Sequence, residues 1–241
     1  MMRVVVNGFM PLTSFQLIFC RMPIELKLGG NVETLDAVVY DCDGVLLETI
    51  PAKLRAYMEW LPLVYEALRG DFAAYNQRSF GLSRVVQIEH FYCKLVGQTV
   101  SEEFIESEVD RFKCICEPLC ETAPWVEGSK EFVEVCNRAG CDSFVLSGTP
   151  QFELEAMLRQ RNAIGLFKEI YGFPETKKGG LARILRKSAH SPGKVLFVGD
   201  AEADAAAAKA LGVHFVYRPS EADHPQTPIL TEAPSLLELL V

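Results

Sequence analysis

The chain has 241 residues, of which 49% are hydrophobic, and its formal net charge is −8 at pH 7. This length suffices for one large domain or for a core with a smaller second domain, and the hydrophobic content predicts a packed core and excludes disorder. The acidic balance argues against nucleic-acid binding, which needs a basic face, so an anion site would have to gather positive charge locally.

The first 20 residues form an apolar run with Arg3 near its start. Such a run is typical of a signal peptide, but polar residues and Pro11 interrupt it and no small-x-small cleavage site follows. It is also too broken for a membrane helix. We expect residues 1–35 to be a poorly ordered or loosely packed extension of a cytoplasmic protein that does not bind membranes. Translation starting at Met22 is an open alternative.

The stretch 36–48 combines a strand pattern with two carboxylates. The run Ala-Val-Val-Tyr at 37–40 predicts a short strand buried on both faces, as in a parallel sheet. Asp41 and Asp43 follow at its carboxyl end, where parallel sheets present functional groups. Residues two apart in an extended chain point the same way, so these anions need a cation, a shared proton or water.

Residues 49–121 lose the strand pattern and show helical periodicity, with Leu54, Met58 and Leu61 on one face. Ser101 followed by Glu103 predicts a further helix start. We therefore expect an all-helical insertion directly after the two aspartates.

Within this insertion, the stretch Gly81-Leu82-Ser83-Arg84 has two interpretations. Ser83 can cap a helix and leave Arg84 in solvent. Alternatively, Arg84 points at the cleft and pairs with an anionic group of a substrate.

The chain has eight cysteines, but its size and the lack of a clear secretory signal argue against a disulfide framework. Cys114, Cys116 and Cys120 could form a metal clip or lie on one side of a helix. The helix is favoured, because a closed zinc site needs four ligands, usually with paired spacing.

From residue 122 to the end, helix and strand patterns alternate, which predicts a parallel sheet with helices on both faces. Strands are expected at 142–147, 170–171, 194–198 and 213–217, helices at 152–161 and 202–211, a loop at 219–234 and a short closing helix at 235–240. Together, residues 36–48 and 122–241 are expected to form a Rossmann-like α/β core domain.

Polar residues follow two of these strands and also begin one helix. Ser147 ends a strand, and Thr149 and Pro150 open a helix whose free amides, with that of Gly148, form an anion site or an ordinary helix cap. Lys177 and Lys178 stand at a helix start, where the helix dipole disfavours cations, so a lysine there should have an anionic partner. The spacing favours Lys177 as the lysine with an anionic partner, and Lys178 is the second choice. Two solvated lysines are the alternative.

Asp200 follows the strand at 194–198, and Asp204 lies one helical turn later, so both carboxylates can face one point. With Asp41 and Asp43 they place up to four carboxylates near one edge of the sheet. Such crowding favours a divalent cation, and all-oxygen ligands favour Mg²⁺.

In order along the chain, four stretches resemble the motifs of the haloacid dehalogenase-like hydrolases. They are Asp41-Cys42-Asp43-Gly44-Val45-Leu46, Ser147-Gly148-Thr149, the Lys177 region and Gly199-Asp200 with Asp204. The resemblance covers roughly residues 36–241 and is to phosphatases of the phosphoglycolate phosphatase and β-phosphoglucomutase type. It implies that residues 49–121 are a helical cap that closes over the active site. A plain helical subdomain is the alternative.

The same resemblance implies the chemistry. Asp41 would attack phosphorus and form an aspartyl-phosphate, and Asp43 would protonate the leaving oxygen and then activate water. Mg²⁺ would be bound by the side chains of Asp41 and Asp200 and by the backbone carbonyl of Asp43, with Asp204 in support. The phosphate would be held by Ser147, Gly148 and Lys177.

The implied function is a phosphatase for a small phosphorylated metabolite, acting as a monomer or a homodimer. Asp43 favours phosphate esters, because dehalogenases and phosphonate-cleaving members lack an aspartate there. A sugar phosphomutase is the alternative, although mutases resemble one another in carrying a histidine where this chain has Lys53. A non-catalytic phosphate-binding regulatory module is the alternative from another class, and such a module has no need of Asp43.

Overall fold

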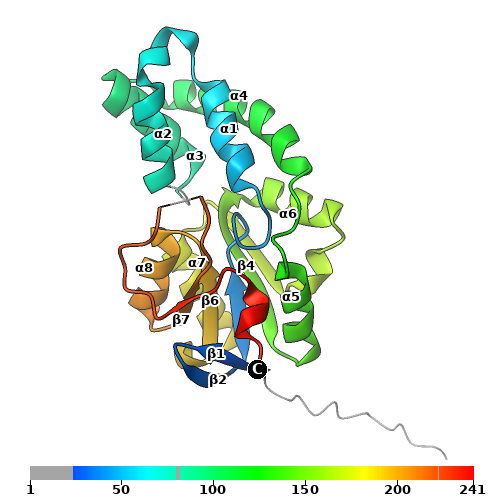
Figure 1. Cartoon of the computed structure of the whole chain (residues 1–241). Coiled ribbons are helices and arrows are strands. Elements are labelled where there is room, and N and C mark those ends of the chain that lie inside the picture. Colours follow the sequence, from blue (N-terminus) through cyan, green and yellow to red (C-terminus); the bar gives the residue numbers. More distant parts are fainter. Residues whose placement is uncertain (1–23, 80–81, 222) are drawn as a thin grey trace, which may run out of the picture.

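The computed structural model describes residues 24–79, 82–221 and 223–241. Its centre is a six-stranded sheet in the order β5-β4-β3-β6-β7-β8, with every neighbouring pair parallel (Figure 1). The strands are β3 (Ala37–Tyr40), β4 (Asp142–Pro150), β5 (Glu169–Phe173), β6 (Val195–Gly199), β7 (His214–Tyr217) and β8 (Thr231–Glu232).

Helices cover both faces of the sheet, because side chains alternate between the faces along the buried central strands. Val39 packs in one apolar cluster with α7 (Lys177–Ser188) and α8 (Glu202–Leu211). Val38 packs in the other with α5 (Ser129–Arg138) and α6 (Gln151–Gln160). Short 3-10 turns lie at 164–166, 192–194 and 236–239. The predicted Rossmann-like parallel sheet with helices on both faces is confirmed.

The register of the sheet aligns the carboxyl ends of its three central strands. Tyr40 pairs with Val145 of β4 on one side and with Val198 of β6 on the other. Asp41, Ser147 and Asp200 come one or two residues beyond these partners, so they gather at one edge of the sheet.

The part of the chain that connects β3 to α5 forms a helical segment, which lies beyond this edge of the sheet (Figure 1). It contains α1 (Ile50–Trp60), α2 (Arg69–Arg78), α3 (Arg84–His90) and α4 (Glu102–Glu121), with a 3-10 turn at 63–68 and a π-helical turn at 91–96. The described part of residues 50–121 contains no strand. No helix of the described residues is both long and apolar enough to cross a membrane.

An aromatic cluster holds the helical segment together. The Trp60 ring contacts Phe72 and Phe91 at centroid distances of 5.7 and 5.3 Å, and Tyr57 stacks on Phe112 of α4 at 4.2 Å. Aromatic pairs of this kind add to the free energy gained by burying their area. The segment therefore has an apolar core of its own that can position side chains over the sheet edge.

Residues 24–35, which were expected to belong to a loose extension, form an antiparallel hairpin of β1 (Ile24–Leu28) and β2 (Asn31–Leu35). Ile24, Leu26 and Leu28 alternate into the core, and Leu26 bridges to Leu240. The alternating pattern, followed by two glycines with positive φ, is the signal for a hairpin that was overlooked. Residues 1–23, with Met22, lie outside the described residues.

Two smaller expectations about the core were wrong. The stretch 219–234, expected to be loop, contains β8, which is only two residues long and pairs with β7. Pro150 precedes α6 as its N-cap instead of occupying the first turn, because β4 continues to this residue after a break in its register. The hydroxyl of Thr149 donates to Asp43 Oδ2 at 2.9 Å and does not cap the new helix.

Candidate active site

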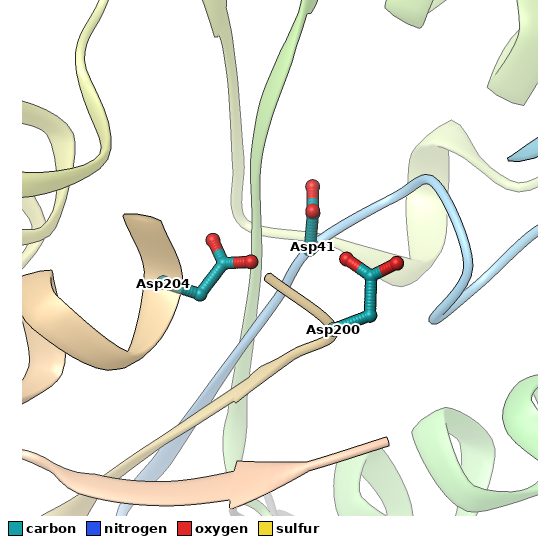
Figure 2. A group of neighbouring side chains, drawn as sticks. All are labelled: Asp41, Asp200 and Asp204. Atoms are coloured by element: carbon teal, nitrogen blue, oxygen red, sulfur yellow. The ribbon is translucent and has the colours of Figure 1, made fainter. Parts of the chain in front are cut away.

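Three buried aspartates meet at the carboxyl edge of the sheet (Figure 2). Asp41 follows β3, Asp200 follows β6, and Asp204 lies in the first turn of α8. One carboxylate oxygen of each lies within 4.8 Å of the others. The expectation that Asp200 and Asp204 face one point is thus met in the structure, and Asp41 joins them.

The loop that carries the first two aspartates is closed by backbone hydrogen bonds from the amides of Leu46 and Leu47 to the carbonyl of Cys42, at 3.0 and 2.9 Å. Gly44 adopts φ +70°, and a Cβ atom there would lie 2.4 Å from Ile50 Cδ1 and 2.5 Å from Asp200 Oδ2. Only glycine fits such a position without displacing neighbours. The turn therefore depends on Gly44 and lies directly against the aspartate group.

Arg218 holds this loop from outside. Its Nη1 donates to the Gly44 carbonyl at 2.9 Å and its Nη2 to Glu48 Oε1 at 2.8 Å. Arg218 follows β7, and nothing in the local sequence pattern indicated this role. We infer that it positions the loop, since a charge-assisted hydrogen bond is stronger than a neutral one.

Lys177 joins the aspartate group. Its Nζ lies 2.8 Å from Asp41 Oδ1 and 2.7 Å from Asp204 Oδ1, and it donates to the Leu146 carbonyl at 3.0 Å. Lys177 is 8% exposed, whereas Lys178 is exposed to solvent. Of the two candidate lysines, the structure brings Lys177 into the site.

The aspartate group is short of positive charge. Burial raises the pKa of Asp41 to about 7 against the attraction of Lys177, with Asp204 and Asp43 adding to the rise. Burial, with repulsion from Asp41 and Asp204, also raises the pKa of Asp200 well above its usual range. Asp200 Oδ1 is buried without a hydrogen-bond partner, while its Oδ2 accepts from Ser220 at 2.8 Å. Crowded carboxylates with an unpartnered oxygen fit a site for a divalent cation, which would offset their repulsion.

The Asp43 side chain does not belong to this group. Its Oδ2 lies 2.6 Å from Lys53 Nζ and accepts hydrogen bonds from Thr149 at 2.9 Å and from Ser147 at 3.4 Å. Its Oδ1 accepts from the hydroxyl of Thr49. Burial alone would raise the pKa of Asp43, but Lys53 and these hydrogen bonds outweigh burial and lower it to about 2.

Lys53 completes the site and was not assigned a role from sequence. It lies on α1, and its Nζ also donates to Thr149 Oγ1 at 2.7 Å. Its place one turn after Thr49, at the position where phosphomutases carry a histidine, was the available signal. The site therefore has two lysine ammonium groups, one paired with Asp41 and one with Asp43.

A pocket of about 40 Å³ lies between these residues and the helical segment. The core contributes Asp41, Asp43, Gly148 and Thr149 to its lining, and the helical segment adds Lys53, Tyr57, Leu82, Arg84, Gln87 and Phe112. Ser147 lies just behind, where its Oγ accepts from the Thr149 amide at 3.1 Å. The last residues of β4 thus bring Gly148 and Thr149 to the pocket, and an anion site there stays a prediction.

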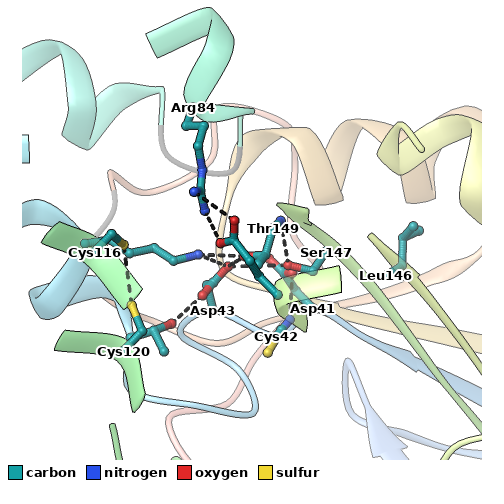
Figure 3. Close-up of polar contacts among 12 residues, drawn as sticks. Asp41, Cys42, Asp43, Arg84, Cys116, Cys120, Leu146, Ser147 and Thr149 are labelled. Atoms are coloured by element: carbon teal, nitrogen blue, oxygen red, sulfur yellow. Dashed lines mark hydrogen bonds and ion pairs between the residues drawn. The ribbon is translucent and has the colours of Figure 1, made fainter. Parts of the chain in front are cut away.

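Arg84 is buried, so the interpretation that leaves its side chain in solvent is wrong. Its guanidinium lines the pocket and lies 5.3 Å from the centre of the Phe112 ring. It forms two hydrogen bonds with Glu153 of α6, at 2.6 and 3.1 Å. Figure 3 shows the Arg84 side chain pointing from the helical segment toward the polar residues of the site. Ser83 does cap α3, with its Oγ 3.5 Å from the Val86 amide. Gly81 lies outside the described residues.

The three clustered cysteines do not come together. Cys116 and Cys120 are buried on one side of α4 with their sulfur atoms 3.6 Å apart, whereas Cys114 is exposed. In the described part of the chain, Asp41, Asp200 and Asp204 are the one group of three or more acidic, cysteine or histidine side chains placed to hold a metal.

The model of the haloacid dehalogenase-like hydrolases matches residues 35–212, which is more than half of the chain. The chain belongs to this family. A phosphoglycolate phosphatase of Pseudomonas fluorescens is 24% identical to this haloacid dehalogenase-like hydrolase over 205 residues, covering 83% of the chain and 75% of the relative. The predicted family and enzyme class, a phosphoric monoester hydrolase of haloacid dehalogenase-like type, are confirmed.

Solved structures share the fold of this hydrolase. CbbY from Rhodobacter sphaeroides in complex with phosphate superposes with a TM-score of 0.68 at 20% identity, covering 86% of this chain and 99% of CbbY. A CbbY variant in complex with xylulose-(1,5)bisphosphate superposes with a TM-score of 0.69 at 19% identity, covering 86% of this chain and all of that chain.

Proposed function

We propose that this haloacid dehalogenase-like hydrolase is a Mg²⁺-dependent phosphatase that hydrolyses a small phosphomonoester through an aspartyl-phosphate on Asp41. One observation carries the proposal. The Asp41 carboxylate stands at the pocket between a buried lysine and two further buried carboxylates, and Asp43, which lines the same pocket, has hydrogen-bond partners of its own. This arrangement separates a nucleophile from an acid and base.

Mg²⁺ would be held by the side chains of Asp41 and Asp200 and by the backbone carbonyl of Asp43. The buried, unpartnered Asp200 Oδ1 supports this assignment, and the ion pair between Asp204 and Lys177 supports an indirect role for Asp204. When bound, the cation would offset the negative charge of the carboxylates and of the phosphoryl group.

The phosphoryl group would lie between Asp41 and the segment Ser147–Thr149. Asp41 attacks phosphorus, the bond from phosphorus to the leaving oxygen breaks, and that oxygen takes a proton from Asp43. Asp43 then takes a proton from the water that attacks the aspartyl-phosphate and releases inorganic phosphate. Lys177 would stabilise the charge on the transferring group.

Asp43 is held as an anion by Lys53 in the described arrangement, so it must gain a proton before it can donate one. A phosphate ester that reaches the pocket competes for Lys53, since its oxygens are anionic. Loss of that ion pair raises the pKa of Asp43, because burial then dominates. Lys53 would thus link substrate binding to the protonation of Asp43.

Residues 49–121 would serve as the cap. Helices α1, α3 and α4 contribute Tyr57, Arg84 and Phe112 to the pocket. These side chains would enclose a substrate from the side opposite the sheet. A substrate would be a small phosphorylated metabolite, the general class that includes the phosphoglycolate and the sugar bisphosphate named for the relatives.

The test is phosphate release from a panel of phosphomonoesters by the wild type, Asp41→Asn and the control Asp71→Asn, whose side chain is exposed on α2. We expect release that requires Mg²⁺, is stopped by chelator, is lost in Asp41→Asn and is retained in Asp71→Asn. Release by Asp41→Asn at the wild-type rate would contradict the proposal. Isomerisation of a sugar phosphate without phosphate release would favour a mutase.

A further inference from the structure

A second cavity of about 270 Å³ adjoins the pocket, and Lys53, Arg84 and Thr149 line both. It lies between α4 of the helical segment and α6 of the core, and we call it the side chamber. The pocket itself is smaller, at about 40 Å³. Because the two cavities share three lining residues, the organic part of a larger substrate could extend from the pocket into the side chamber.

The walls of the side chamber are partly apolar, and the rest of the lining carries more acidic than basic side chains. The apolar part comes from Cys116, Cys120, Ala156 and Met157. The acidic part comes from Glu117, Glu121 and Glu153. These three carboxylates outnumber the two cations of the lining, Lys53 and Arg84, so the chamber disfavours a further anion.

The cations of the side chamber are already paired. Lys53 lies against Asp43, and Arg84 is held by both oxygens of Glu153. Nearby, Arg161 donates to the carbonyls of Cys120, Glu121 and Ala123. Among the described residues that line the chamber, no positive charge is without a carboxylate partner.

We propose that Glu153 determines specificity, so that the leaving alcohol is uncharged or amine-bearing and a second anionic group is excluded. This inference rests on the proposed phosphatase function. To bind a carboxylate or a second phosphate, Arg84 would have to leave Glu153, and the buried Glu153 would then face the incoming anion unpaired. Specificity of this kind comes from a repulsive element in addition to attractive contacts.

The placement of the ion pair between Arg84 and Glu153 supports a role in specificity. Arg84 comes from the helical segment and Glu153 from the core, and their side chains are 8% and 12% exposed. Both line the side chamber, and the Phe112 ring beneath the guanidinium helps to keep Arg84 in place. The pair therefore lies where the distal part of a substrate would lie.

The experiment compares kcat/KM for glycerol 3-phosphate, phosphoethanolamine and 2-phosphoglycolate in the wild type and in Glu153→Gln. The wild type is expected to favour the first two esters. Removing the charge of Glu153 frees Arg84, so the ratio of 2-phosphoglycolate to glycerol 3-phosphate should rise about tenfold, the scale of a charge-assisted hydrogen bond.

Two further variants make the result specific. Glu155→Gln makes the same charge change on the same helix at a residue that does not line the chamber, and it should leave the ratio at the wild-type value. Arg84→Gln combined with Glu153→Gln should lose the gain, because the anion then has no guanidinium to bind.

A wild type that prefers 2-phosphoglycolate, or a ratio that Glu153→Gln leaves unchanged, would overturn this inference alone. A wild type that releases phosphate from no ester would overturn the proposed function and this inference with it. The preference of the wild type is informative even if a variant fails to fold.

Discussion

Lys53 Nζ lies 2.6 Å from Asp43 Oδ2, and through this contact the helical segment fixes the charge of a carboxylate in the core. Lys53 belongs to α1, whereas Asp43 belongs to the loop after β3. A change in the position of α1 would therefore change the protonation of Asp43. This relation connects the helices over the site to the proposed acid and base.

The ion pair between Lys53 and Asp43 predicts a pH-dependent effect of Lys53→Met on the free energy of unfolding. The pKa of Asp43 is about 2 in the folded protein and about 3.9 when unfolded, so the pair's contribution is complete above about pH 4 and is lost as the pH falls through 2. In Lys53→Met, the burial of Asp43 is no longer offset by its ion-pair partner, which costs about 3 kcal/mol at pH 7.

Urea unfolding of both proteins between pH 3 and pH 7, in chelator, measures this effect. The difference in unfolding free energy should be largest at pH 7 and should shrink toward pH 3. Carboxylates other than Asp43 titrate in both proteins, so their contribution largely cancels in the difference. A difference that stays constant across this range would contradict the assigned ion pair.

The aspartate group predicts that Mg²⁺ raises the melting temperature. The pKa of Asp41 is raised to about 7, so the cation-free folded state loses stability as the pH rises from about 4 to 7, and a bound cation should restore it. The Mg²⁺-induced shift in Tm should therefore be larger at pH 8 than at pH 5. At about a hundred times its Kd, Mg²⁺ would add roughly 2.7 kcal/mol.

Asp200→Asn separates the repulsion among the aspartates from the stabilisation by bound Mg²⁺, and it does so without a measurement of turnover. Without metal, this variant should melt at or above the wild-type temperature, because it removes one of the mutually repelling charges. It should also lose the Mg²⁺-induced shift. A variant that keeps the full shift would show that Asp200 is not a ligand.

Gly44→Ala should disrupt the site, because the new Cβ would lie within 2.5 Å of both Ile50 Cδ1 and Asp200 Oδ2. We expect a loss of roughly 1–3 kcal/mol in stability together with most of the activity. Gly30→Ala is the matched control, since Gly30 also has a positive φ, of +86°, but no atom lies near its Cβ position. It should lose some stability and keep full kcat/KM.

Lys177→Met should lower kcat by about a thousandfold, the scale of removing a charge that stabilises a transition state. Lys178→Met removes the same charge from the adjacent, exposed position and should stay within about twofold of wild type. Steady-state kinetics with one ester is sufficient for this comparison. Equal losses in the two variants would contradict the assignment of Lys177.

The parts of the site that could be predicted from sequence are those set by strand ends. A buried strand followed by a polar residue places that residue at the sheet edge, so the sequence pattern alone was enough to bring Asp41, Ser147 and Asp200 together. The alternation of strand and helix also determined which way the strands run.

What could not be predicted are contacts between elements far apart in the sequence. The pairs Lys53 with Asp43 and Arg84 with Glu153 depend on how the helical segment lies over the core, and periodicity carries no information about that packing. Arg218 likewise reaches Gly44 across 174 positions. The hairpin at 24–35 was different, since its alternating pattern was present in the sequence and was overlooked.

The central claim is that Asp41 becomes phosphorylated, and the Asp43→Asn variant offers the most direct test. With 4-nitrophenyl phosphate the leaving group needs little help from an acid, so phosphorylation should proceed, whereas hydrolysis of the aspartyl-phosphate should be slow. We predict a burst of about one equivalent of 4-nitrophenol and, by mass spectrometry of the acid-quenched digest, phosphate on the peptide that contains Asp41. A steady release of 4-nitrophenol without a burst, or phosphate on a different residue, would contradict the claim.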